Sequence, residues 1–156
     1  MAQAQANGMA IEYELSGPVD GPVLLMIHGV GAQMIRWPPA FRDRLERAGF
    51  RTLRFDNRDV GLSTHMTGAA TPDIAAVVEA RRQGREPDLP YTLSDMAADT
   101  VGLLDALGIP AAHVLGVSLG GMIAQVMAIE HRSRVLSLNI LMSQSGNPDL
   151  PPSRPE

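Results

Sequence analysis

The chain has 156 residues, of which 45% are hydrophobic and 19% are charged, and it contains no cysteine. This composition predicts one soluble domain and excludes disulfides and cysteine-based metal or redox sites. The net charge of −4 gives no basis for nucleic acid or an anionic membrane as partner, and residues 2–7 lack the basic start and apolar run of a signal peptide, so we expect a cytoplasmic protein.

The N-terminal stretch predicts a hairpin followed by a buried strand. Asn7-Gly8 separates the extended residues 3–6 from the extended residues 9–15, and both turn residues tolerate positive φ. Residues 23–27 form a continuous apolar run, which is typical of a strand buried on both faces. We therefore expect three strands before the first helix.

A helix and a fourth strand are predicted next. Pro38 and Pro39 suit a helix start, and Gly49 is placed as the C-terminal cap. Residues 51–55 then have the composition of a strand. The residues expected to share one face of this helix are Phe41, Leu45 and Ala48.

Residues 64–91 are the least regular part of the chain, and we expect an insertion there between the fourth strand and the next helix. Within it, residues 71–73 predict the cap of a short helix that stops near Gly84. Thr92 and Asp95 then have the spacing of a capping box at the start of a longer helix. The expected buried face of that helix comprises Leu93, Met96, Thr100, Leu104 and Leu107.

The following stretch predicts a strand that turns sharply into a helix at Ser118. Gly116 and Gly120 lie two places on either side of it, and small residues there let a strand and a helix approach closely. The backbone N–H of Leu119 would lie at the helix N-terminus, where it favours an anion. The apolar residues that recur at helical spacing after the turn are Met122, Ile123, Val126, Met127 and Ile129.

The last elements complete the expected fold. Residues 135–142 predict a final apolar strand, and residues 144–156 are too rich in proline for further regular structure. Strands that alternate with helices imply a mostly parallel sheet with helices on both faces. We therefore expect an α/β fold in a single domain over residues 1–156.

Three motifs in this chain resemble the N-terminal half of the α/β-hydrolases. They follow the third, fourth and fifth predicted strands, in the family's order. In sequence they are His28-Gly29, Asp56-x-Arg58-x-x-Gly61-x-Ser63 and Gly116-x-Ser118-x-Gly120. Residues 58–63 and 146–151 look most like the branch that contains aclacinomycin methylesterase and proline-iminopeptidase-like hydrolases.

The resemblance implies a catalytic role for Ser118 as the nucleophile. It also implies that the backbone N–H groups of Leu119 and Val30 form an oxyanion hole. Because Ser stands where dehalogenases and epoxide hydrolases have Asp, the implied chemistry is acyl transfer to water. We expect no cofactor and no metal, since the four histidines fit no metal-ligand spacing.

Neighbouring motif residues are expected to support the site. We expect the His28 ring to bond loop backbone rather than to act as a base, next to Gly29. Asp56 and Arg58 are expected to be a polar pair that fixes a turn. Asp59 stands where the family usually has Gly, and Asp tolerates positive φ better than most residues.

A general base is missing from the pattern. A triad in this fold runs in the order Ser, acid, His, and the only histidine after Ser118 is His131, thirteen residues along the predicted helix and roughly 20 Å away. His65 and His113 are placed no better. Asp149 is a weak candidate for the acid, with a solvated tail carboxylate as the favoured alternative.

The pattern as a whole predicts a serine hydrolase that cleaves a small carboxylic ester through an acyl-enzyme. We expect it to be incomplete in this chain, which looks truncated after the sixth strand. The apolar edge strand over residues 135–142 then predicts self-association or a completing chain. A proline-iminopeptidase-like amidase and a non-catalytic fragment or interaction module of the same fold stay open as alternatives.

Overall fold

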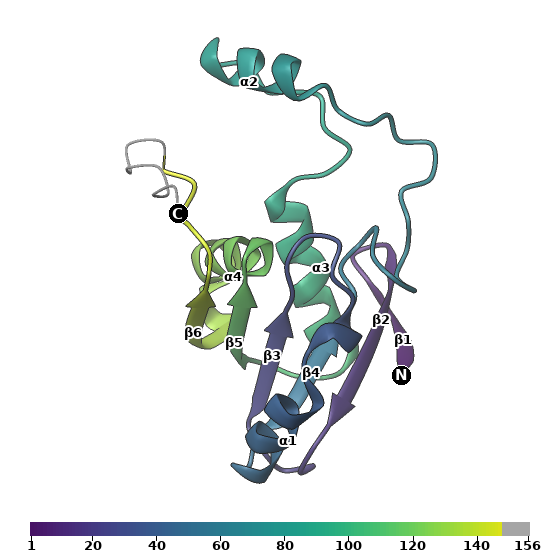
Figure 1. The fold of residues 1–156 in the computed structure, drawn as a ribbon, viewed down its shortest axis with the longest axis vertical. Coiled ribbons are helices and arrows are strands. Elements are labelled where there is room, and N and C mark those ends of the chain that lie inside the picture. The colour runs from purple at the N-terminus through teal and green to yellow at the C-terminus, as the bar shows by residue number, and fades with distance from the viewer. Residues whose placement is uncertain (148–156) are drawn as a thin grey trace.

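A six-stranded sheet forms the centre of the protein in the computed structural model, which describes residues 1–147 (Figure 1). The strand order is β1-β2-β4-β3-β5-β6. The first two pairings, β1 with β2 and β2 with β4, are antiparallel, and the remaining ones are parallel. The strands are β1 Ala2–Ala6, β2 Met9–Ser16, β3 Val23–Ile27, β4 Arg51–Phe55, β5 Ala112–Val117 and β6 Val135–Leu141. The predicted α/β fold with a mostly parallel sheet and an N-terminal hairpin is confirmed.

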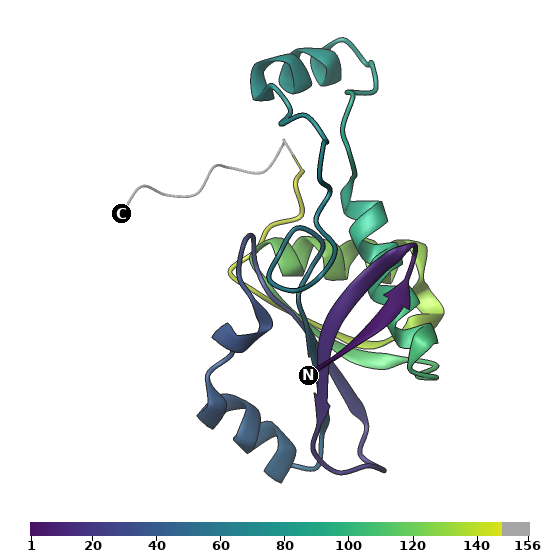
Figure 2. The same cartoon turned by 90° about the vertical axis from the view of Figure 1, so that its right-hand side faces the viewer.

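Helices cover both faces of the sheet, as Figure 2 shows. Helix α1 lies on one face, and α3 and α4 lie on the other, while α2 projects beyond the carboxyl ends of the parallel strands. No helix within residues 1–147 has the length and apolar character needed to cross a membrane. The helices are α1 Pro39–Arg47, α2 Ile74–Arg82, α3 Leu93–Ala106 and α4 Leu119–Glu130, with short 3₁₀ turns at Met34–Arg36 and Arg132–Arg134.

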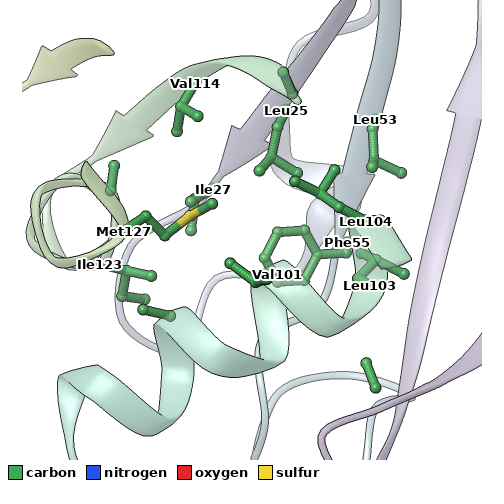
Figure 3. Packing of buried hydrophobic residues seen from close by; sticks show 14 of the residues in the cluster. Leu25, Ile27, Leu53, Phe55, Val101, Leu103, Leu104, Val114, Ile123 and Met127 are labelled. Carbon is green, nitrogen blue, oxygen red and sulfur yellow. The ribbon is translucent and has the colours of Figure 1, made fainter. Parts of the chain in front are cut away.

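The main core lies between the sheet and the pair α3 and α4 (Figure 3). Leu25 and Ile27 of β3 point into it, together with Phe55 of β4. Leu24 and Met26 belong instead to a smaller cluster with Trp37 on the other face. Alternate residues of β3 therefore serve both faces, which explains why its sequence is apolar throughout.

Two of the apolar helix positions are exposed. No residue of α1 is fully buried and Phe41 is exposed, although Leu45 packs against the smaller cluster, and polar groups also attach this helix to the sheet. Glu46 accepts hydrogen bonds from the hydroxyls of Ser16 at 2.6 Å and Thr52 at 2.8 Å. At the end of α4, Ile129 is 79% exposed.

Local turn and cap signals agree with the structure. Asn7 and Gly8 both have positive φ, at 50° and 76°, in the turn between β1 and β2. Asp73 caps α2 through its side chain, which accepts the N–H groups of Ala75 and Ala76. The capping box of Thr92 and Asp95 at the start of α3 is complete in both directions. The stretch 64–91 is thus an extended loop that carries one helix.

Replacing Asp95 with Ala tests the capping box. We expect a loss of about 1 kcal/mol at neutral pH. Hydrogen bonds from the Thr92 side chain and backbone hold the pKa of the Asp95 carboxyl below its ordinary value of 3.8. A lowered folded-state pKa gives stability that is complete above the unfolded-state pKa and is lost as pH falls through the folded-state pKa.

The gap in melting temperature between wild type and Asp95→Ala should therefore stay constant from about pH 7 to about pH 5 and narrow below about pH 4. Thermal unfolding followed by circular dichroism measures it. Asp88→Ala, in an exposed position outside any cap, is the control. A gap that does not change with pH would contradict the carboxylate's role.

Candidate active site

The strand order creates a crevice at the carboxyl ends of β3 and β5. From β3 the chain crosses to β4 on one side, whereas β5 pairs with β3 on the other side. Loops that leave two such strands in opposite directions open a crevice where ligands bind in α/β proteins. Here the two loops are residues 28–31 after β3 and the turn at Ser118 after β5.

Ser118 occupies a strained turn. Its backbone has φ 55° and ψ −122°, a conformation that costs a non-glycine residue about 1–3 kcal/mol. The Ser118 N–H donates to the Leu141 carbonyl at 3.0 Å, and the Ser118 carbonyl accepts the Gly121 N–H at 2.9 Å. The side chain is exposed, and its hydroxyl does not cap α4. The turn is thus fixed through its backbone and presents the hydroxyl to solvent.

The predicted close approach around this turn involves three glycines. A Cβ on Gly116 would collide with the Gly120 carbonyl, and a Cβ on Gly120 would collide with the Ile27 carbonyl at the end of β3. A Cβ on Gly29 would lie only 3.1 Å from Ser118 Cβ. Helix α4 and the loop after β3 therefore meet directly at the serine.

This contact brings the two predicted oxyanion residues, Leu119 and Val30, to one cavity. Leu119 is the first residue of α4, so its N–H has no acceptor within the helix and lies at the positive end of the helix dipole. Val30 follows Gly29, in a turn that the hydrogen bond from Ala32 N–H to Gly29 carbonyl closes at 3.2 Å. Val30 and Leu119 line the same cavity, which measures about 680 Å³.

His28 lies beside the site with its ring already engaged. Its Nδ1 accepts the Gly29 N–H at 2.8 Å, and the ring packs against Trp37 at 4.8 Å between centroids. Burial, and then the charge of Arg36, lower the pKa of His28. A neutral ring whose Nδ1 accepts a hydrogen bond carries its proton on Nε2 and offers no lone pair to a serine proton.

The other histidines lie away from Ser118. His65 Nε2 bonds the Gly61 carbonyl at 3.1 Å, and His113 Nδ1 bonds the Ser137 hydroxyl at 2.8 Å near the start of β5. His131 follows α4 at the end opposite to the serine. Asp149 lies outside the described residues. In residues 1–147 no group of three or more His, Cys, Asp or Glu is placed to hold a metal ion.

The motif after β4 holds the loop after β3. Asp56 accepts the Met34 N–H at 2.6 Å and the Leu62 N–H at 3.2 Å. Asn57, a buried residue that the sequence analysis did not select, donates to the His28 carbonyl at 3.3 Å. Its place next to Asp56, directly after a strand, could have identified it, because a buried amide needs hydrogen-bond partners. Asp59 has φ 62°, the conformation that glycine adopts most easily.

Arg58 corrects one expectation, because it does not pair with Asp56. Its guanidinium binds Asp99 of α3 through two hydrogen bonds of 2.6 and 2.7 Å, and both side chains are almost fully buried. The side-chain amide of Asn7 also donates to Asp99, at 2.9 Å. The hydrogen bonding that Arg58 donates to Asp99 is the largest cause of the raised pKa of Arg58. This buried pair ties the motif to α3 and to the N-terminal hairpin.

Comparisons with known proteins agree with this architecture. A family model described as alpha/beta hydrolase fold matches residues 22–154. Rhodomycin D methylesterase DnrP of Streptomyces peucetius is 34% identical over 128 residues, which are 82% of this chain and 37% of that protein. RutD of Variovorax paradoxus, a candidate carbamate hydrolase, is 33% identical over 137 residues, 88% of this chain and 44% of RutD.

A solved structure shows the same relation. The crystal structure of a hydrolase from Pseudomonas aeruginosa PA01 has a TM-score of 0.72 and 30% identity, and the match covers 92% of this chain and 46% of that chain. The chain therefore spans less than half the length of each of these three relatives.

Gly120→Ala tests the contact between α4 and β3. The new Cβ meets backbone rather than a movable side chain, so we expect a loss of about 3 kcal/mol in the free energy of unfolding. Gly84→Ala is the matched control, because a Cβ there meets nothing within 4 Å and the cost comes from its φ of +68°, about 1 kcal/mol. Urea denaturation measures both, and equal losses would count against the close approach.

The Arg58–Asp99 pair is tested by a double-mutant cycle. Arg58→Met or Asp99→Leu alone leaves a buried charge without its partner, and each should cost about 3–5 kcal/mol. The double variant should be more stable than either single variant, since no unpaired charge is left. Arg81→Met, in an exposed pair with Glu86, should cost less than about 1 kcal/mol. Additive losses at Arg58 and Asp99 would refute the coupling.

Proposed function

This chain belongs to the alpha/beta hydrolase fold family, near its methylesterase branch, and from that premise we propose that it carries the nucleophile and oxyanion hole of a serine hydrolase that cleaves small carboxylic esters. The observation that supports this most strongly is the strained, exposed turn at Ser118. Gly29 packs against this serine, and the N–H of Leu119 has no helical acceptor. Strain of this kind is retained where the geometry serves a site.

In the proposed reaction, Ser118 Oγ attacks the ester carbonyl carbon while a base takes the hydroxyl proton. The negative charge that develops on the carbonyl oxygen is held by the N–H groups of Leu119 and Val30, each donor being worth about 3 kcal/mol. The C–O bond to the alcohol then breaks, and the alkoxide leaves with the proton from the base. Water hydrolyses the acyl-enzyme in the same way and restores the serine.

We propose that the base and the acid come from outside the described residues. His28, His65 and His113 are each engaged elsewhere, and His131 is at the wrong end of α4. Asp149 stays a weak candidate for the acid. The chain spans less than half the length of its relatives, so in this proposal residues 1–156 are part of one domain, with 64–91 as an insertion and 144–156 as a proline-rich tail.

The edge strand β6 is the proposed place for the completing part. Six of its seven residues are exposed, and Leu136 is 58% exposed. An exposed apolar edge of this kind pairs readily with another strand. We propose that further strands, a second copy or another chain cover it. The methylesterase relatives support an ester as substrate over the amide of a proline-iminopeptidase-like enzyme.

Covalent labelling with a fluorophosphonate tests the nucleophile. A protein that contains this chain together with the proposed base and acid should gain the mass of one phosphonyl group on Ser118. Its Ser118→Ala variant should lose at least about a thousandfold in labelling rate. Ser143→Ala, which removes a nearby hydroxyl, should still be labelled on Ser118. Absence of label would instead support the non-catalytic module.

An activity assay of the 156-residue chain by itself complements the labelling experiment. It should not turn over p-nitrophenyl acetate, because no base reaches the serine in residues 1–147. Turnover that disappears in Ser118→Ala would show that a histidine of this chain acts as the base.

A further inference from the structure

Strand β1 forms one edge of the sheet and lacks the features that usually protect an edge strand. Natural edge strands are kept from pairing with other chains by charged residues, by proline, by a bulge or by a covering element. Residues 1–8 contain neither a charged side chain nor proline, and β1 pairs with β2 in an unbroken register from Ala2 to Ala6. Figure 2 looks at the sheet from this edge, and no helix lies in front of β1. The outer side of β1 is therefore open to another strand.

The backbone groups of Gln3 and Gln5 point away from β2. In an antiparallel pair, two residues that lie opposite each other either bond each other or both face outward. Gln3 lies opposite Glu12, and Gln5 lies opposite Ala10. The N–H groups of Glu12 and Ala10 donate to hydroxyls of residues 63–64, on the other side of β2. Gln3 and Gln5 thus present N–H and C=O groups that no residue of the described part of the chain binds.

The sequence of β1 reads the same in both directions, as Ala-Gln-Ala-Gln-Ala. A second copy of β1, laid antiparallel and centred on Ala4, places its Gln5 opposite Gln3 and each alanine opposite an alanine. Both outward backbone groups of every glutamine are then bonded, and Ala4 lies on the two-fold axis. A two-fold interface requires a surface that complements itself, and this strand meets that requirement.

The side chains of β1 also suit a second copy. Ala6 is buried and Ala4 is half-buried in the main core, whereas Gln3 and Gln5 are exposed, so the amides of two copies can hydrogen-bond across the pair. Helix α3 meets β1 near the turn, where Gly102 packs on Ala6, so the α3 helices of two copies lie toward opposite ends of the strand pair. The chain has a net charge of −4, and an uncharged strand brings no like charges into contact.

We propose that β1 is a self-association surface, through which two copies of this chain pair antiparallel about Ala4 and join their sheets into one. Strand β1 runs in the same direction as β4, because each is antiparallel to β2. The crevices at the carboxyl ends of the parallel strands therefore lie at opposite ends of the joined sheet, and both Ser118 turns stay open. The proposal concerns β1 rather than β6, and it does not depend on the proposed hydrolase function.

A cysteine in place of Ala4 tests the register, since the chain has no cysteine of its own. In the proposed dimer the two Ala4 residues form a pair without hydrogen bonds, with about 4.5 Å between Cα atoms, which suits a disulfide. Ala4→Cys should therefore become cross-linked under mild oxidation with copper phenanthroline. Gln3→Cys should cross-link at least about fivefold more slowly, because the two copies of residue 3 are offset along the strands.

Leu138→Cys, at the centre of β6, is the control for pairing through the other edge of the sheet. Electrophoresis without reductant measures the cross-linked fraction of each variant. Equal rates for Ala4→Cys and Gln3→Cys would overturn the proposed register. Faster cross-linking of Leu138→Cys than of Ala4→Cys would overturn the choice of β1 and assign the interface to β6.

Paired charge changes test the same register in solution. Gln3→Lys/Gln5→Lys places like charges directly opposite each other and should weaken dimerisation about tenfold, whereas Gln3→Lys/Gln5→Glu pairs opposite charges and should dimerise at least as well as wild type. Sedimentation velocity measures the dissociation constant, which we expect on the order of 100 µM because one strand pair buries little surface. Gln83→Lys, at an exposed position outside the sheet, should leave it unchanged.

The two double variants change the same positions, so a difference between them does not come from damage to the hairpin. Equal dissociation constants for these two variants would contradict pairing about Ala4. A wild-type chain that stays monomeric up to about 1 mM, tenfold above the expected dissociation constant, would overturn the proposal altogether.

Discussion

The direct contact between the first turn of α4 and the end of β3 is the constraint on which the site depends. Gly120 lies so close to the carbonyls of Ile27 and His28 that no side chain fits between them. This contact sets the N-terminus of α4 beside the loop after β3, so that Leu119 and Val30, which come from two separate segments, line one cavity.

The strained turn at Ser118 depends on an element that is itself poorly covered. The Ser118 N–H is held by the Leu141 carbonyl at the end of β6, and the described residues leave most of β6 exposed. The free energy that keeps the serine in its unfavourable conformation therefore comes partly from the edge of the sheet. In the proposed site, a segment that covered β6 would therefore also stabilise the turn at Ser118.

Features set by neighbouring residues could be predicted from the sequence. The Asn7-Gly8 turn, the capping box of Thr92 and Asp95 and the glycine spacing around Ser118 each depend on a few adjacent positions. Contacts between distant segments could not be predicted. Arg58 and Asp99 are 41 residues apart, and only an acidic residue on the buried face of α3 hinted at a partner. The polar attachment of α1 likewise depends on which strand lies beneath the helix.

The motif after β4 touches no reacting atom, yet it joins most of the parts that shape the site. Asp56 holds the turn at Met34, Asn57 holds the His28 carbonyl, and Arg58 binds α3. Ser63 accepts the Glu12 N–H of β2 and donates to the Asp56 carbonyl, which attaches the motif to the hairpin. The position of the loop that carries Val30 is therefore fixed by Asp56 and Asn57 of the motif after β4. A chain that kept Ser118 but lost Asn57 would retain the proposed nucleophile while loosening the loop that carries the proposed second oxyanion donor, because the turn at Ser118 and the Val30 loop are held by different contacts.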